Sequence, residues 1–175
     1  YLLESQIIND IEIDGANRKW IATSGGGLFL MSEDGTTTIY SFSSQNSPLF
    51  SDQVNALAIN DKTGEVYIAS EDGIQGFKSS ATTSHLSFQP LEAYPNPVRE
   101  NYFGNVAIKG MMSNSEVKVT DANGILIQNL VSEGGQAIWN GKNLENEFVP
   151  SGVYYFFSTS QDGYSKAKGK VLIIR

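Results

Sequence analysis

The 175-residue chain contains no cysteine and a single histidine. Without thiols it has no disulfides, no thiolate zinc sites and no cysteine nucleophile. His85 lies in a Ser/Thr-rich stretch, and a catalytic triad needs a base that a third group holds in place. The sequence therefore predicts that His85 belongs to a linker and that the protein is not an enzyme, with no cofactor and no bound metal.

Long apolar runs are also missing, since none approaches the length of about 18 residues that a membrane helix needs. No basic segment followed by an apolar core opens the chain, so no signal peptide is expected either. Basic residues are few: 12 Lys and Arg stand against 19 Asp and Glu, which gives a net charge of −7. This balance excludes general nucleic-acid binding and a polybasic membrane patch.

The charge is unevenly divided between the two halves of the chain. Residues 1–89 carry 11 acids and 4 bases (4 − 11 = −7), whereas residues 90–175 carry 8 of each, for a net charge of zero. Four of the latter bases are close to the C-terminus, at Lys166, Lys168, Lys170 and Arg175. Such an asymmetry favours two units with different surfaces.

The first half contains a repeat with an offset of about 46 residues. The alternating segment 8–14 is echoed by 54–60, and Trp20-Ile21-Ala22-Thr23 is echoed by Tyr67-Ile68-Ala69-Ser70. Each copy predicts three short antiparallel strands joined by turns rich in Asx and Gly. A period of this size is typical of propeller blades. Two blades cannot close a ring of about four to eight, so residues 1–89 are expected to be the last blades of a longer propeller.

A domain boundary is predicted near residue 90. Residues 79–90 lose all periodicity and read as a linker or as a last edge strand of the propeller. The following Tyr94-Pro95-Asn96-Pro97 disfavours both helix and central strand. Beyond it, about seven short strands predict an immunoglobulin-like sandwich over residues 90–175; the candidates are 104–110, 115–121, 124–131, 135–140, 145–149, 152–160 and 164–174.

Residues 11–28 resemble the two-component regulator propeller repeat. The matching features are the Asp14-Gly15 turn, the strand around Trp20, and Gly25-Gly26-Gly27-Leu28. Ala22 replaces the usual Gly, and the second copy departs further, with Tyr67 in the place of Trp. Independently of the resemblance, Trp20 is large enough to be a packing anchor between blades, and the glycines permit a tight turn.

The second half is similar to the C-terminal sorting-type domain of the type IX secretion system. The resemblance depends on segments 94–97, 117–124, 151–155 and 168–175, and segments 139–142 and 149–154 also resemble the flagellar-hook-cap immunoglobulin-like domain. A regulator-type propeller followed by such a domain is similar to a surface component of that system. The resemblance implies a location on the outer membrane of a Bacteroidetes-type bacterium, exported through the periplasm, and action together with the sortase that attaches cargo to anionic lipopolysaccharide.

Three features could carry chemistry. Asp10, Glu12 and Asp14 would share one strand face at steps of about 7 Å, where they could bind calcium, although a solvated blade face is the favoured interpretation. Ser24-Gly25-Gly26-Gly27 lacks the lysine and helix of a phosphate loop. Alternation in 153–157 gives two large apolar faces, which indicates a strand covered on both sides or one face that meets a partner. Burial on both sides is the favoured interpretation.

The sequence thus predicts an all-β protein, in which the last blades of a propeller (1–89) precede an immunoglobulin-like sandwich (90–175). The leading hypothesis is a non-enzymatic type IX secretion component that the sortase and the translocon recognise, with anionic lipopolysaccharide as a further candidate ligand. A secreted cargo or adhesin and the sensor propeller of a hybrid two-component system are the alternatives. The predicted recognition residues are Tyr94, Pro95, Asn96, Pro97, Asp121, Gly124, Gly152, Val153, Tyr154, Lys170 and Arg175.

Overall fold

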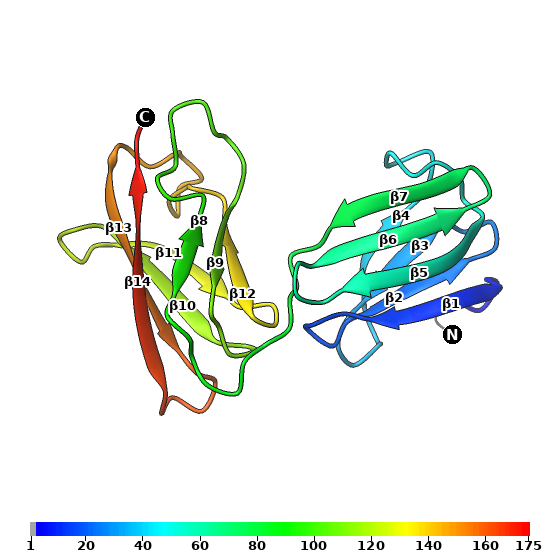
Figure 1. Ribbon diagram of the computed structural model, residues 1–175, viewed down its shortest axis with the longest axis horizontal. Coiled ribbons are helices and arrows are strands. Elements are labelled where there is room, and N and C mark those ends of the chain that lie inside the picture. The colour runs from blue at the N-terminus through cyan, green and yellow to red at the C-terminus, as the bar shows by residue number, and fades with distance from the viewer. Residues whose placement is uncertain (1–2) are drawn as a thin grey trace. The chain divides into compact units, whose positions relative to one another are not determined.

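The computed structural model describes residues 3–175 of the protein (Figure 1). All regular elements of this part of the chain are strands, arranged in four antiparallel sheets, which confirms the all-β expectation. The chain divides into two compact units, Tyr1–Thr83 and Ser84–Arg175. No helix within residues 3–175 is long and apolar enough to cross a membrane.

The first unit begins with a four-stranded blade in the order β1-β2-β3-β4. Its strands are β1 (Ile8–Ile13), β2 (Lys19–Thr23), β3 (Leu28–Met31) and β4 (Thr38–Phe42). The turn between β2 and β3 requires glycine, as expected. Gly27 has φ +81°, and a Cβ at this position would lie only 2.1 Å from the Phe42 carbonyl oxygen. The strand β4 was not predicted, because most of its residues are exposed and give no hydrophobic alternation.

A three-stranded blade follows, in the order β5-β6-β7. Its strands are β5 (Val54–Asn60), β6 (Glu65–Ser70) and β7 (Gly73–Lys78), so they repeat β1, β2 and β3. One apolar core joins the two blades, and Trp20 is fully buried in it. The Trp20 ring stacks parallel to Phe42 at 6.2 Å and meets Phe77 of the second blade at 5.7 Å. Trp20 is therefore the packing anchor that its size predicts.

The second blade has no counterpart of β4 within the described residues. By the offset of 46, Thr38–Phe42 would correspond to residues 84–88. This segment instead joins the second unit, where the His85 amide donates to the Met111 carbonyl at 3.1 Å and the Gln89 amide donates to the Gly110 carbonyl at 3.0 Å. The units consequently divide at 83/84, six residues before the predicted boundary, because backbone pairing fixes this stretch that the sequence suggested was a linker.

The second unit is a sandwich of two sheets (Figure 1). The larger sheet has the order β11-β10-β13-β14 and the smaller one β12-β9-β8. The bounds of the strands are Glu92–Tyr94 for β8, Val106–Lys109 for β9, Glu116–Thr120 for β10, Leu126–Val131 for β11, Gln136–Trp139 for β12, Gly152–Thr159 for β13 and Lys166–Ile173 for β14. Alternate residues of β9, β10, β13 and β14 fill the space between the sheets, as period-2 alternation requires.

The core of this sandwich is built around Trp139, Tyr154 and Phe156. Trp139 is fully buried, lies 5.5 Å from the Tyr154 ring and donates from Nε1 to the Lys142 carbonyl at 2.9 Å. The expected strand at 145–149 does not form. An isolated bridge between Lys142 and Phe148 takes its place, because the Asn143 carboxamide accepts from two backbone amides and closes a turn there.

Candidate functional site

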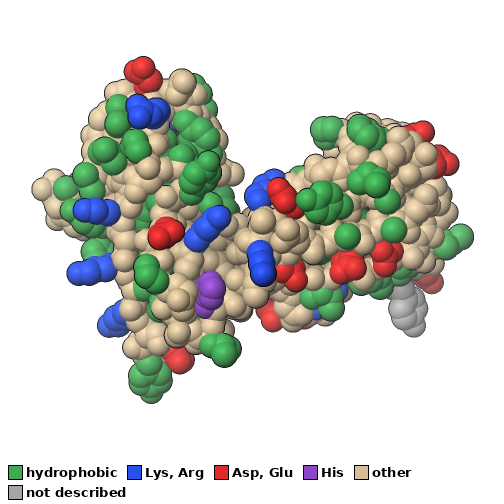
Figure 2. All heavy atoms as spheres, in the orientation of Figure 1, with side chains coloured by type: hydrophobic (Ala, Val, Ile, Leu, Met, Phe, Trp, Pro, Cys, Tyr) green, Lys and Arg blue, Asp and Glu red, His purple; other side chains and the backbone are tan. Residues whose placement is uncertain are grey.

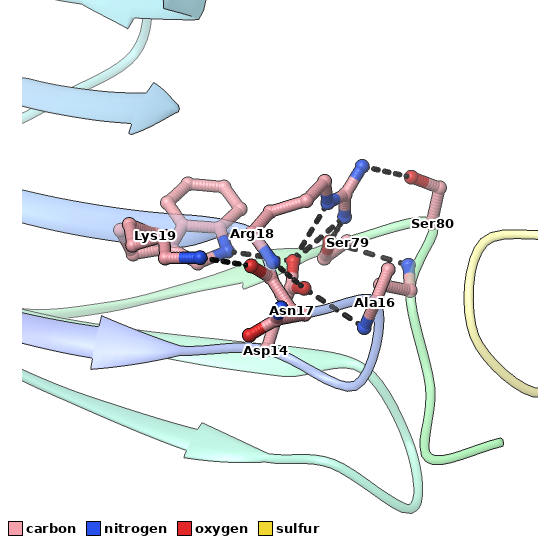
Figure 3. A network of polar contacts seen from close by, with 9 residues as sticks. Asp14, Ala16, Asn17, Arg18, Lys19, Ser79 and Ser80 are labelled. Atoms are coloured by element: carbon pink, nitrogen blue, oxygen red, sulfur yellow. Dashed lines mark hydrogen bonds and ion pairs between the residues drawn. The ribbon is translucent and has the colours of Figure 1, made fainter. Parts of the chain in front are cut away.

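The expectation that Asp10, Glu12 and Asp14 share a solvated strand face is wrong for Asp14, which is buried, and for Asp10, which is bonded to the second blade. Asp14 is 5% exposed and forms an ion pair with Arg18, 6% exposed, across 2.8 Å (Figure 3). The same carboxylate accepts from Trp20 Nε1 at 3.1 Å. Arg18 also donates to the hydroxyls of Ser79 at 2.9 Å and Ser80 at 3.2 Å. The cluster therefore fastens the β1–β2 turn to the segment after β7, and its hydrogen-bonding capacity is used internally.

Asp10 and Glu12 of β1 are both partly buried. Asp10 Oδ2 accepts from the Leu57 amide of β5 at 2.8 Å, and Oδ1 accepts from the Ile11 amide at 2.9 Å. The Asp10 carboxylate thus joins the two blades. Within residues 3–175, no group of three or more acidic or histidine side chains is placed to hold a metal ion.

The Tyr94-Pro95-Asn96-Pro97 motif caps the edge of the terminal strand. Both X–Pro peptide bonds are cis, and the motif lies beside the C-terminal part of β14. Asn96 Oδ1 accepts from the Leu172 amide at 3.1 Å, while Asn96 Nδ2 donates to the Lys170 carbonyl at 3.4 Å. The Asn96 carboxamide thereby supplies the two hydrogen bonds that a neighbouring strand residue would supply. Tyr94 itself is 72% exposed.

The last residue, Arg175, is fixed at both its backbone and its side chain. Its amide donates to Ser151 Oγ at 2.8 Å, and Ser151 Oγ donates to its carbonyl oxygen at 2.9 Å. The guanidinium lies over the Phe148 ring, 4.2 Å from the centroid, which is cation–π geometry. The predicted residue Arg175 therefore lies on a platform formed by Phe148 and Ser151.

The other predicted recognition residues are dispersed over the sandwich. Tyr154 is 4% exposed in the core and donates from its hydroxyl to the Pro150 carbonyl at 2.9 Å, so a partner cannot contact it directly. Burial, with a further contribution from the Asp121 carboxylate, raises the pKa of the Tyr154 phenol. Asp121 closes the β10–β11 turn, accepting from the Asn123 amide at 2.9 Å, and Gly124 follows it with φ +83°.

Val153 and Lys170 belong to one continuous surface, the outer face of the β11-β10-β13-β14 sheet. Tyr155 is 37% and Phe157 is 47% exposed there. The preference for burial on both sides of β13 is therefore wrong: the core takes Tyr154 and Phe156 and leaves the other side open. We name this surface the lysine–aromatic face; it comprises Lys118, Val153, Tyr155, Phe157, Lys166, Lys168, Lys170 and Leu172. Glu116 lies on the same side of β10 as Lys118 and adds one carboxylate to this face.

The register places aromatic and basic side chains next to one another on this face. Phe157 pairs with Lys168 on one side and Lys118 on the other, and Tyr155 pairs with Lys170. Only Val153 and Lys170 of this face were among the predicted site residues. Alternation in 166–172, which puts every lysine on one side of the strand, was the available signal for Lys166 and Lys168. Nothing local in the sequence indicates that Lys118 lies beside Phe157.

A small apolar pocket of about 170 Å³ lies between the two blades. Its wall includes Leu28, Phe42, Leu49, Ile68 and Phe77. The side chain of Gln75 at its mouth donates to the Pro48 carbonyl at 2.8 Å and accepts from the Phe50 amide at 2.7 Å, so its polar groups are occupied. Its lining holds no acidic or basic side chain, and its hydroxyl, Ser47 Oγ, donates to the Ser43 carbonyl at 2.7 Å.

The whole chain aligns with a solved structure of PorZ, an essential bacterial surface component of the type IX secretion system of Porphyromonas gingivalis. The identity is 34% and the TM-score 0.63, and the match covers 100% of this chain but 24% of the PorZ chain. This chain thus spans about a quarter of the length of the relative that it matches. Comparison with protein-family models and with curated proteins finds no match.

Two extracellular domains from B. thetaiotaomicron are more distant neighbours. One, from a putative one component system, has 12% identity and a TM-score of 0.34, with 96% of this chain and 25% of that chain covered. The other, from a putative hybrid two component system, has 13% identity and a TM-score of 0.37, with 96% and 38% covered. Scores this low support no inference about this chain.

Proposed function

We propose that the protein is a non-enzymatic component of a type IX secretion system at the bacterial cell surface, whose terminal sandwich is recognised by the translocon and the sortase. The observation that carries this proposal is that the whole of this chain aligns with about a quarter of PorZ at 34% identity. That alignment runs through both the two blades and the sandwich, so it supports the combination of units and not a blade repeat alone.

The contacts of the sandwich fit a recognition module better than a catalytic one. Its C-terminal strand is held by Asn96 and its last residue by Ser151, so the terminal segment is presented as part of a rigid surface. Its exposed side holds lysines and aromatic rings rather than a cleft with paired acid and base groups, which catalysis by proton transfer requires. Exposed aromatic side chains are enriched at protein–protein interfaces relative to the rest of a protein surface.

The test uses the whole chain, fused behind a reporter that a signal peptide delivers to the periplasm. In a type IX-competent strain we expect the reporter at the cell surface, accessible to added protease, and no surface reporter in the same strain without the translocon. A reporter that stays periplasmic in both strains would overturn the proposal. The intact mass of the surface form then separates roles, because cleavage near residue 90 indicates a cargo or adhesin and retention indicates a system component.

A further inference from the structure

The lysine–aromatic face concentrates positive charge on a unit with no net charge. Residues 90–175 carry 8 acids and 8 bases, yet four of those bases, Lys118, Lys166, Lys168 and Lys170, gather on the outer face of one sheet. Figure 2 shows basic side chains spaced along the side of this unit where β14 runs. None of these four lysines forms an ion pair with another of the residues 3–175.

Protection of a sheet edge explains only part of this arrangement. β14 is at the edge of its sheet, and lysines on an edge strand discourage pairing with other chains. Lys118, however, is on β10, an interior strand, and Phe157 is on β13, the interior strand beside it. Interior strands have no free edge to protect. Exposed aromatic rings also work against solubility, so edge protection gives no reason for Tyr155 and Phe157.

The centre of the face is apolar and its margin is basic. Tyr155 and Phe157 continue into the cross-strand pair Val153–Leu172, and Leu172 is 40% exposed. A hydrophobic centre with a charged rim is the usual composition of a protein–protein contact. Aliphatic side chains such as Leu172 offer no hydrogen bonds to the hydroxyl groups of a sugar. The four lysines outnumber the carboxylate of Glu116 on this face, so a negatively charged partner surface would complement it.

We propose that the lysine–aromatic face is the docking surface for an acidic protein, with the rings inserted into an apolar patch of the partner and the lysines opposite its carboxylates. Because this inference rests on the proposed function, the probes are the purified type IX sortase and the purified outer-membrane translocon subunits. Charge on the rim speeds association and makes it sensitive to salt. The aromatic pair is expected to control dissociation.

The experiment measures binding of the full-length chain to each probe by surface plasmon resonance at low and high salt. The double variant Lys168→Gln/Lys170→Gln should weaken binding about ten-fold, mostly through slower association. Its matched control is Lys62→Gln/Lys109→Gln, which makes the same charge change at exposed sites outside the face and should leave binding unchanged. Phe157→Thr should weaken binding at least ~30-fold, whereas Tyr164→Thr, at an 89%-exposed turn position, should not.

Each outcome decides between the surface and the function. If the wild-type chain binds a probe and the face variants bind equally well, the docking surface is refuted while the proposed function stands. If the wild-type chain binds neither probe and its reporter fusion is not exported, both the docking surface and the proposed function are refuted. If an anionic polysaccharide binds in a lysine-dependent manner and no protein probe does, the partner is not an acidic protein and the proposal is wrong. Circular dichroism confirms that every variant is folded.

Discussion

Gly169 is the position where the sandwich leaves no room for a side chain. It lies on β14, paired with Phe156 of β13, at a position whose side chain would point toward the opposite sheet. A Cβ at this position would be 2.7 Å from the Leu91 carbonyl oxygen and 2.9 Å from the Leu91 Cβ. Since the closest atom belongs to the backbone, the two sheets must move apart to admit one methyl group. Overpacking of this kind costs about 1–3 kcal/mol.

The substitution Gly169→Ala also has a favourable side, because alanine has less conformational entropy to lose on folding, which contributes about 0.5–1 kcal/mol. The expected net loss in the free energy of unfolding is therefore about 1 kcal/mol. The matched control is Gly76→Ala on β7, another strand glycine with ordinary φ, whose added Cβ would meet nothing within 4 Å. That variant should gain about 0.5 kcal/mol.

Urea unfolding followed by hydrogen exchange with mass spectrometry measures both variants and assigns the change to a unit. Gly169→Ala should accelerate exchange in residues 84–175 and leave exchange in the blades unchanged. Gly76→Ala should accelerate exchange in neither unit. A Gly169→Ala protein as stable as the wild type would refute the close approach of Leu91. Loss of stability in both variants would show that removing glycine from these strands is harmful for another reason.

Three further predictions concern polar groups. Asp14→Ala leaves the Arg18 charge buried and should cost about 3–5 kcal/mol in urea unfolding. Asp14→Ala/Arg18→Met should cost less, and an equal or larger loss in the double variant would contradict a stabilising Asp14–Arg18 ion pair. Asn96→Ala should raise the exchange rate of the Leu172 amide about five-fold, and an unchanged rate would show that the cap contributes nothing. Hydrogen bonds from Ser32 and Thr36 lower the pKa of Asp34 from 3.8 to about 2. Because the folded pKa lies below the unfolded one, the stability that this carboxylate contributes is complete above about pH 4 and is lost as the pH falls toward 2; a carboxyl NMR titration midpoint near 4 would contradict it.

Most strands of the sandwich were predictable because their signal is local. The segments 115–121, 152–160 and 164–174 alternate in hydrophobicity and are bounded by turn residues, and β10, β13 and β14 appear there. The prediction of a strand at 145–149 was wrong for an equally local reason, because Asn143 closes a turn that competes with strand pairing. β4 was not predicted because an exposed strand that pairs with only one neighbour shows no alternation in hydrophobicity.

The candidate site was predictable only in pieces. The Pro95 and Pro97 motif could be recognised as a boundary, but the role of Asn96 depends on residues 74 and 76 positions later in the chain. The same applies to Lys118, which becomes a neighbour of Phe157 only through strand pairing. Asp14 shows the converse. Its spacing from Asp10 and Glu12 indicated a solvated face, whereas it is buried against Arg18, which in turn bonds to the segment after β7.

The sequence alone determined the elements of this protein: an all-β chain, two blade repeats, the turns with left-handed glycines and the alternating terminal strands. These follow from side-chain periodicity and backbone freedom, which act over a few residues. Tertiary structure decided which acids are buried, where residues 84–88 pair, and which side of β13 meets water. Those outcomes depend on contacts between segments far apart in the chain, and only the folded arrangement brings those segments together.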